Sequence, residues 1–205
     1  MINKLKYQSI FIEFICLIMI VPSLYGQLEN NQSISKRGTT AAQFLKISTG
    51  GRGTSMGGAN VALCSDLTSS YWNPAGISKL QGVQVYFENY DWLAGTEYHF
   101  GAFGFSWSGV GVMSLSMTML STPDDLVRTV EKPQGTGEKF NAQDLSINLS
   151  FAKTLTDRLS LGASIKNVRQ RIWHSSGQTI ATDIGVQYKT PIKNLLLGAS
   201  ISNFG

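Results

Sequence analysis

A glycine-rich stretch near the start of the chain has the clearest potential for chemistry. The segment GTSMG (residues 53–57) matches G-x-S-x-G, the pattern that places a nucleophilic serine, here Ser55, on a strand-to-helix turn in α/β hydrolases. His99 and His174 follow it and are the candidate bases. Such a site needs strands that alternate with helices, whereas the sequence after residue 80 predicts one strand after another. We therefore predict no catalytic residue and no enzyme.

Other chemistries have weaker signals. A phosphate-binding loop needs Lys-Ser or Lys-Thr after its glycines, and neither dipeptide follows here. The histidines are not at metal-ligand spacing, and Cys64 is the only cysteine outside the first 26 residues. We predict no metal, no cofactor and no disulfide. Lys166, Arg169 and Arg171 are too few for the basic patch of a nucleic-acid-binding protein, so we predict no nucleic-acid partner.

The first residues predict export from the cytoplasm. Residues 1–26 have a basic start, an apolar core and small residues near Gly26, which is typical of a secretory signal peptide. Glu13 interrupts the apolar core, which argues against a stable membrane-spanning helix. Residues 27–37 form a polar tail. The sequence therefore predicts an exported protein.

The composition is poor in charge for a soluble protein. Of 205 residues, 42% are hydrophobic and only 15% are charged, whereas about 25% is usual in soluble domains. The net charge of +4 is a weak clue, because the basic residues are scattered. Something other than a charged surface must therefore keep this protein dispersed.

From residue 81 onward, apolar residues alternate with small polar ones. In DLSINLSFAK (residues 144–153), leucine, isoleucine and phenylalanine point one way, and aspartate, serine and asparagine the other. A period of two is the signature of a strand with two unlike faces. About seven strands are predicted, at roughly 82–90, 97–107, 111–120, 142–154, 159–172, 179–189 and 194–204.

The nature of the polar face and of the connections favours a membrane barrel over a soluble sandwich. The polar face carries serine, glycine, asparagine and threonine with little lysine or glutamate, as suits an enclosed lumen. Short connections alternate with longer ones, as in outer-membrane barrels. Because every backbone polar group must be paired inside a bilayer, the sheet must close. The short connections are 108–111, 155–158 and 190–194, and the longer ones are 91–96, 121–141 and 174–178.

Residues 38–80, here called the N-terminal block, carry a recognisable set of motifs. They are FLKI (residues 44–47), the glycine turn GRGTSMGGA, Asp66, and YWNPAGI (residues 71–77). This block resembles the start of PorV/PorQ-family outer-membrane proteins, which belong to the FadL-like barrel group. The motif residues, to which we assign a structural role, are Arg52, Gly53, Met56, Gly57, Gly58, Asp66, Asn73, Pro74, Ala75 and Gly76.

The resemblance implies an all-β fold, an antiparallel transmembrane outer-membrane β-barrel of about fourteen strands with the N-terminal block as a plug in its lumen. The plug glycines would serve tight packing, and we expect Asp66 to cap a helix. Because residues 81–205 hold only about seven strands, we expect this chain to be an incomplete, N-terminal half of such a barrel.

The resemblance also implies a function in the bacterial outer membrane. Proteins of this type assist type IX secretion by binding the translocon and cargo proteins, and loop 121–141 is the expected contact. Two alternatives stay open. One is a FadL-like transporter of hydrophobic small molecules, with Phe44, Leu45 and Trp72 lining a pocket. The other is an exported soluble β-sandwich that acts as an adhesin or structural module.

Overall fold

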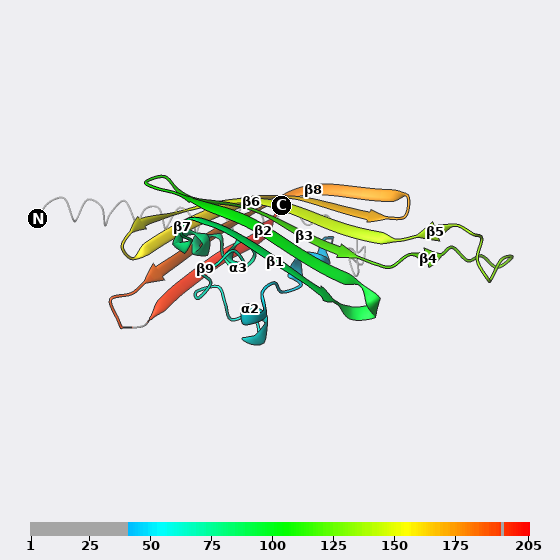
Figure 1. Cartoon of the computed structure of the whole chain (residues 1–205), viewed down its shortest axis with the longest axis horizontal. Helices are drawn as coiled ribbons and strands as arrows, with labels where there is room; N and C mark the ends of the chain where they lie inside the picture. Colours follow the sequence, from blue (N-terminus) through cyan, green and yellow to red (C-terminus); the bar gives the residue numbers. More distant parts are fainter. Residues whose placement is uncertain (1–40, 194) are drawn as a thin grey trace, which may run out of the picture. The chain divides into compact units, whose positions relative to one another are not determined.

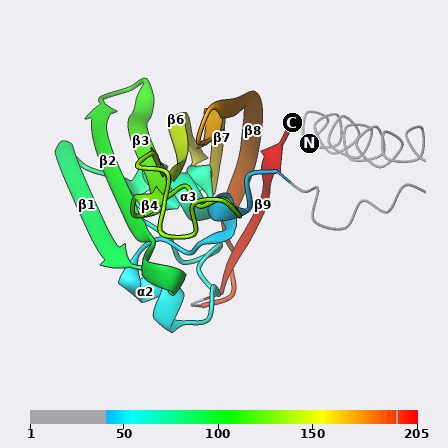
Figure 2. The same ribbon diagram turned by 90° about the vertical axis from the view of Figure 1, so that its right-hand side faces the viewer.

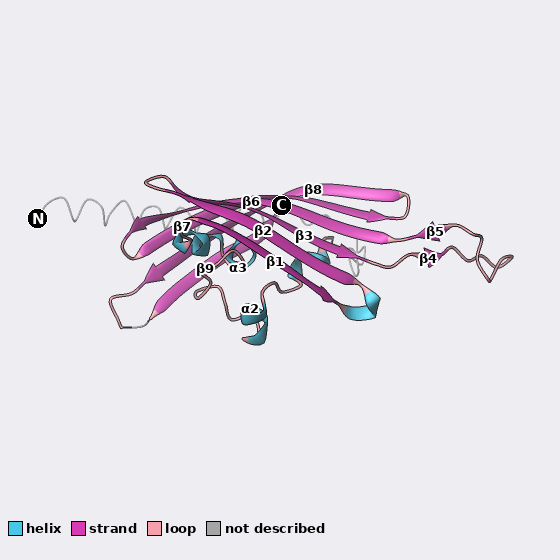
Figure 3. Cartoon of the chain, in the orientation of Figure 1, coloured by secondary structure: helices cyan, strands magenta, loops and turns pink. Residues whose placement is uncertain are grey.

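The computed structural model describes residues 41–193 and 195–205, and the predicted signal peptide (1–26) and polar tail (27–37) lie outside them. The described chain is predominantly antiparallel β-structure with a few short helices, which confirms the predicted all-β class (Figure 3). No helix in these two ranges is long and apolar enough to span a membrane.

The described part of the N-terminal block, residues 41–80, contains only short helical turns. Glycines and serines break its apolar runs, and Pro74 at the first position of a turn fixes where that turn begins. Its elements are η2 (Gln43–Lys46), α2 (Gly51–Ser55), α3 (Ser69–Trp72) and η3 (Pro74–Lys79).

Seven long strands form one antiparallel sheet, and each occupies a region where a strand is predicted. Their order in the sheet follows the order in the sequence (Figure 1). They are β1 (Val83–Asp91), β2 (Glu97–Trp107), β3 (Gly111–Ser121), β6 (Ala142–Thr156), β7 (Leu159–Ile172), β8 (Ser175–Lys189) and β9 (Leu196–Phe204).

The connections differ from the prediction in two places. Residues 174–178 are not a loop, because Ser175–Gln178 pair with Arg169–Ile172 and leave a two-residue turn between β7 and β8. Loop 121–141 contains a small ribbon made of β4 (Asp125–Leu126) and β5 (Lys139–Phe140). The remaining short helix, η4 (Leu93–Gly95), joins β1 to β2. Short and long connections therefore do not alternate strictly.

The sheet is curved but open. β1 and β9 lie at its two edges, and each pairs with only one of the described strands. Figure 2 shows the seven strands as a trough with α3 on its inner side. The closed barrel of about fourteen strands is thus not formed by the strands that the structure describes.

The two faces of the sheet invert the usual arrangement of a soluble protein. The concave face, which is turned toward the N-terminal block, buries polar side chains such as Ser146, Asn148 and Ser150. The convex face exposes the residues between them, and Ile147 and Leu149 are each close to half exposed. The register places Leu115, Leu149 and Ile165 side by side across three strands. An apolar band therefore runs across the outside of the sheet.

A small apolar core joins the N-terminal block to the concave face. Leu67 and Leu80 pack there over Gly104 of β2. The core members, all buried, are Phe44, Leu45, Ile47, Leu67, Ile77, Leu80, Tyr98, Phe100, Ala102, Val112, Ala152 and Val168. This core holds the block against β2, β3, β6 and β7.

Candidate functional site

The candidate site is the surface where the N-terminal block meets the concave face of the sheet. Asn73 is its centre: the side chain is fully buried, and its Oδ1 accepts a hydrogen bond from the Ala75 amide at 3.0 Å. The Asn73 Nδ2 donates to the Val61 carbonyl at 2.9 Å and to the Val186 carbonyl of β8 at 3.0 Å. A single amide group thus closes the turn that starts η3 and ties it to the sheet.

Glycines in the strands let this turn approach the sheet backbone. Gly162 of β7 and Gly185 of β8 are paired across the strands. A Cβ at Gly162 would overlap the Pro74 backbone, and one at Gly185 would overlap the Asn73 side chain. Gly198 of β9 lies under Ala62 in the same way, because a Cβ at Gly198 would be only 2.5 Å from the Ala62 Cα. The close approach therefore requires glycine in the sheet as well as in the block.

Polar side chains of the sheet complete the attachment by pairing with backbone carbonyls of the block. Gln187 Nε2 donates to the Cys64 carbonyl at 3.0 Å, and Asn148 Nδ2 donates to the Ser70 carbonyl at 3.1 Å. The Ser200 hydroxyl donates to the Trp72 carbonyl at 3.1 Å. An irregular segment has carbonyls that no helix or strand satisfies, and these side chains satisfy them.

In the glycine turn, the expected tight packing occurs at Gly53, whereas Gly51 and Gly57 are exposed and a Cβ at either would meet nothing within 4 Å. Gly53 in α2 is buried against Trp72, whose ring would lie 2.7 Å from a Cβ at that position. Gly57 and Gly58 have φ values of 65° and 84°. Arg52 and Met56 point to solvent.

The remaining motif residues also have structural contacts. Asp66 is not the cap of α3, as was expected, because the N-cap residue of this helix is Thr68; the Asp66 Oδ1 instead accepts a hydrogen bond from the Thr68 amide at 2.9 Å, in the turn that leads into α3. Gly76 is buried, and a Cβ there would lie 2.6 Å from the Cys64 carbonyl oxygen. The structure therefore brings the motif residues 73–76, at the start of η3, onto one docking surface, whereas Arg52 and Met56 lie outside it.

A buried ion pair lies beside this surface. Lys166 Nζ of β7 is 2.7 Å from Asp183 Oδ2 of β8, and both side chains are almost completely buried. Asp183 also accepts hydrogen bonds from the Ser164 hydroxyl at 2.8 Å and from the Asn203 amide at 2.7 Å, and Lys166 donates to Asn203 Oδ1 at 2.8 Å. This network fixes the end of β9 where the β8–β9 register shifts. Sequence reasoning noted Lys166 only as part of a scattered basic group.

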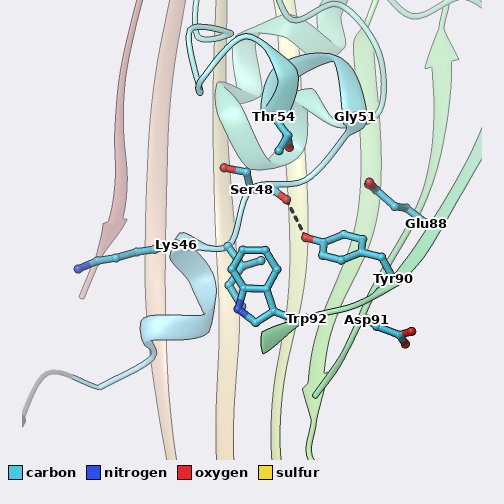
Figure 4. A pocket seen from close by; sticks show the side chains of 9 residues that line it. Lys46, Ser48, Gly51, Thr54, Glu88, Tyr90, Asp91 and Trp92 are labelled. Carbon is cyan, nitrogen blue, oxygen red and sulfur yellow. Dashed lines mark hydrogen bonds between the residues drawn. The ribbon is translucent and has the colours of Figure 1, made fainter. Parts of the chain in front are cut away.

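Two of the cavities between the block and the sheet bear on ligand binding. The larger, of about 580 Å³, lies between residues 46–54 and the end of β1 (Figure 4). The smaller, of about 340 Å³, is lined by both Leu45 and Trp72, two of the residues expected to contact a hydrophobic ligand. The third, Phe44, is buried in the core and is not among the lining residues of either cavity.

The three residues of the hydrolase pattern, Ser55, His99 and His174, each contact other groups in the structure. Ser55 is exposed at the end of α2, and its hydroxyl donates to the Arg52 carbonyl at 3.0 Å. His99 lies 3.5 Å from Glu97, and His174 lies 3.2 Å from Glu138. Among the described residues, no group of three histidine, cysteine, aspartate or glutamate side chains is placed to hold a metal ion.

The reactivity of the Cys64 thiol measures whether the N-terminal block is docked on the sheet. Its side chain is buried, and burial raises the pKa of the thiol above its ordinary value. The folded protein therefore exposes little thiolate to a reagent. In a Cys16→Ser background, we expect maleimide to modify Cys64 at least about tenfold more slowly than a cysteine placed at the exposed Ser108. Equal rates in the native protein, measured by mass spectrometry, would contradict this docking.

The docking glycines were missed by the sequence analysis, although a signal for them existed. RLSLGASIK and NLLLGASIS (residues 158–166 and 194–202) share Gly-Ala-Ser, and both glycines face the N-terminal block. A glycine at a polar-face position of a strand indicates close backbone approach. No protein-family model matches the sequence, and a search of curated proteins finds no match either.

Proposed function

We propose that this protein is an outer-membrane β-barrel protein of the PorV/PorQ type, whose convex face contacts lipid and whose loops bind protein partners in type IX secretion. The observation that carries the proposal is the inversion of the two faces. Ser150 is 1% exposed, whereas its neighbour Leu149 is 46% exposed. In water this band would be an extended apolar patch of the kind that soluble monomers avoid, which argues against the soluble sandwich.

The size of the apolar band suits a bilayer. On the convex face of β6, apolar residues run from Leu145 to Phe151, between Gln143 and Lys153. The six residue steps from Leu145 to Phe151 span about 20 Å along the strand, and the ten steps between the flanking Gln143 and Lys153 span about 33 Å. At the tilt of about 40° found in membrane barrels, these lengths are about 15 Å and about 25 Å of height, and the lipid-facing band of such barrels is about 25 Å tall.

A closed barrel needs more strands than the seven in this sheet. β1 and β9 run in the same direction, because they are the first and the seventh of seven consecutive antiparallel strands. Only an odd number of further strands can close such a sheet with antiparallel pairs alone. Seven more strands satisfy this condition and give the fourteen that the resemblance to PorV/PorQ proteins implies. The proposal therefore includes strands beyond β1 and β9.

Loop 121–141 and the β7–β8 turn form the proposed recognition surface. Trp173 Nε1 donates to Glu138 Oε1 at 3.1 Å, and the Trp173 amide donates to the Asn141 carbonyl at 3.0 Å. The loop is thereby held against the turn, while Val130 within it is fully exposed. An apolar side chain presented on a supported loop is suited to anchor a protein partner.

The test is co-purification from a bacterium with type IX secretion. We expect the full chain to fractionate with the outer membrane and to retain secretion components in mild detergent. Val130→Asp should lower their recovery at least about tenfold, because an interface anchor is worth about 2 kcal/mol or more. Val110→Asp, an exposed valine in the β2–β3 turn at the other end of the strands, should not. Recovery in the aqueous fraction without detergent would overturn the proposal.

The transporter is the second candidate, and the smaller cavity favours it. Leu45 and Trp72 line its apolar part, while Lys166 and Asn203 line a polar part. A ligand with an apolar tail and a polar head would fit such walls. Uptake of a fluorescent fatty acid that depends on this protein, without co-purifying secretion components, would support this candidate over the first.

A further inference from the structure

The larger cavity has a negative, aromatic interior. The Glu88 carboxylate lies on one side of it, and the rings of Tyr90 and Trp92 form another (Figure 4). Tyr90 stacks on Tyr98 with ring centroids 4.9 Å apart, and Trp92 meets Tyr90 nearly edge to face at 6.0 Å. This ring cluster forms a π-surface next to a carboxylate.

Glu88 lacks a cationic partner within the described residues. Its Oε2 accepts hydrogen bonds from the Gly50 amide at 2.8 Å and from the Tyr86 hydroxyl at 3.1 Å, and both donors are neutral. No ion pair of Glu88 occurs in residues 41–193 or 195–205. Lys46 also lines the cavity, but Figure 4 shows its ammonium group extending away from Glu88.

We propose that this cavity binds an organic cation, an alkylammonium or guanidinium group carried on a short apolar chain. The cation would pair with the Glu88 carboxylate and lie against the faces of Tyr90 and Trp92, as cations do on aromatic rings. Ile47 would contact the apolar chain, and Ser48 and Thr54 also line the cavity. A volume of about 580 Å³ is sufficient for a ligand of this size.

The probes are n-butylguanidinium and n-butylurea, which differ in charge but hardly in shape. We expect calorimetric titration of the full chain in detergent to show n-butylguanidinium binding at least about tenfold more tightly than n-butylurea, a difference of 1.4 kcal/mol. Equal affinities, or no binding of either probe at millimolar concentration, would overturn the proposal.

A third probe, acetyl-Gly-Arg-Gly-amide, tests whether the cation comes from a protein side chain. Binding as tight as that of n-butylguanidinium assigns the site to a basic side chain of a protein, and weaker binding assigns it to a small free organic cation; both support the proposal.

Substitutions of the lining residues test whether the cation binds in this cavity. Glu88→Gln keeps an oxygen for the Gly50 amide but removes the charge, so it should weaken n-butylguanidinium binding at least about tenfold. Trp92→Ala should weaken it severalfold. Trp107→Ala removes an exposed tryptophan from the end of β2 and should change nothing. Slow maleimide modification of Cys64 shows that each variant is folded. A folded Glu88→Gln protein that binds like wild type would refute the assignment.

Discussion

Replacing both Gly162 and Gly185 by alanine will detach the N-terminal block from the sheet. Each new methyl group would occupy the space now filled by Asn73 and Pro74. The backbones on both sides are held by strand pairing and by the Asn73 hydrogen bonds, so neither can move away without breaking other contacts. Overpacking of this kind costs about 1–3 kcal/mol per site. We expect the pair to cost about 3 kcal/mol or more of docking free energy.

The rate of Cys64 modification measures this loss. When a thiol reacts only through a transient open state, 3 kcal/mol of destabilisation raises the rate about a hundredfold. The matched control is Gly101→Ala together with Gly177→Ala, two strand glycines where a Cβ meets nothing closer than 3.8 Å. These control substitutions should leave the Cys64 rate unchanged. Similar acceleration in both double variants would contradict the docking geometry.

Asp183→Asn will lower the stability of the protein by about 3–5 kcal/mol, because it leaves the Lys166 ammonium buried without its counter-charge. The side-chain oxygen Oδ1 of Asn203 still accepts a hydrogen bond from Lys166, but a neutral acceptor does not replace a carboxylate. The substitution also weakens the acceptor of the Asn203 amide at the end of β9. The measurement is equilibrium unfolding in urea of the protein refolded in detergent, followed by tryptophan fluorescence.

Two further variants test whether the stability lost in Asp183→Asn comes from breaking the buried ion pair. Asp125→Asn breaks the ion pair with Arg128, whose nitrogen and oxygen are 3.4 Å apart and whose side chains are more than half exposed, so it should cost no more than about 1 kcal/mol. Lys166→Met combined with Asp183→Leu removes both buried charges and should recover most of the lost stability. If Asp183→Asn and Asp125→Asn have equal costs, the buried pair does not have the role assigned to it.

The strands could be predicted because their signal is local. In β6, the side chains of Ser146, Asn148 and Ser150 face the block and those of Ile147 and Leu149 face outward, as the period of two predicts. Neighbouring residues on a strand must point to opposite faces, so a window of a few residues contains the information. That the polar face would turn inward and the apolar face outward was a separate prediction. It was based on the polar face being made of serine, glycine, asparagine and threonine with little lysine or glutamate.

The β7–β8 connection could not be predicted from its residue types. Ser175, Ser176 and Gly177 favour turns and loops when considered alone. In the structure they pair with Arg171, Gln170 and neighbouring residues of β7 and extend both strands to a turn at Trp173 and His174. Pairing with a neighbouring strand overrides local preference, and that partner is not visible in a short window.

The docking surface was the least predictable part of the candidate site. The Asn73 motif was recognised as a unit, but the contact between Asn73 and Val186 spans 113 positions. Neither segment alone indicates the other. Of the expected ligand contacts, Phe44 and Leu45 both belong to the buried core, and only Leu45 and Trp72 line the smaller cavity.

The most direct test of the central claim, that the convex face contacts acyl chains, is labelling with a lipid-soluble carbene precursor. The full chain is reconstituted into vesicles, irradiated and mapped by mass spectrometry. We expect labels on Leu145, Ile147 and Leu149 and none on Ser146 and Asn148, because the first three form the outer band and the last two lie against the N-terminal block. Labels on Ser146 and Asn148 with none on the three apolar residues would contradict the claim.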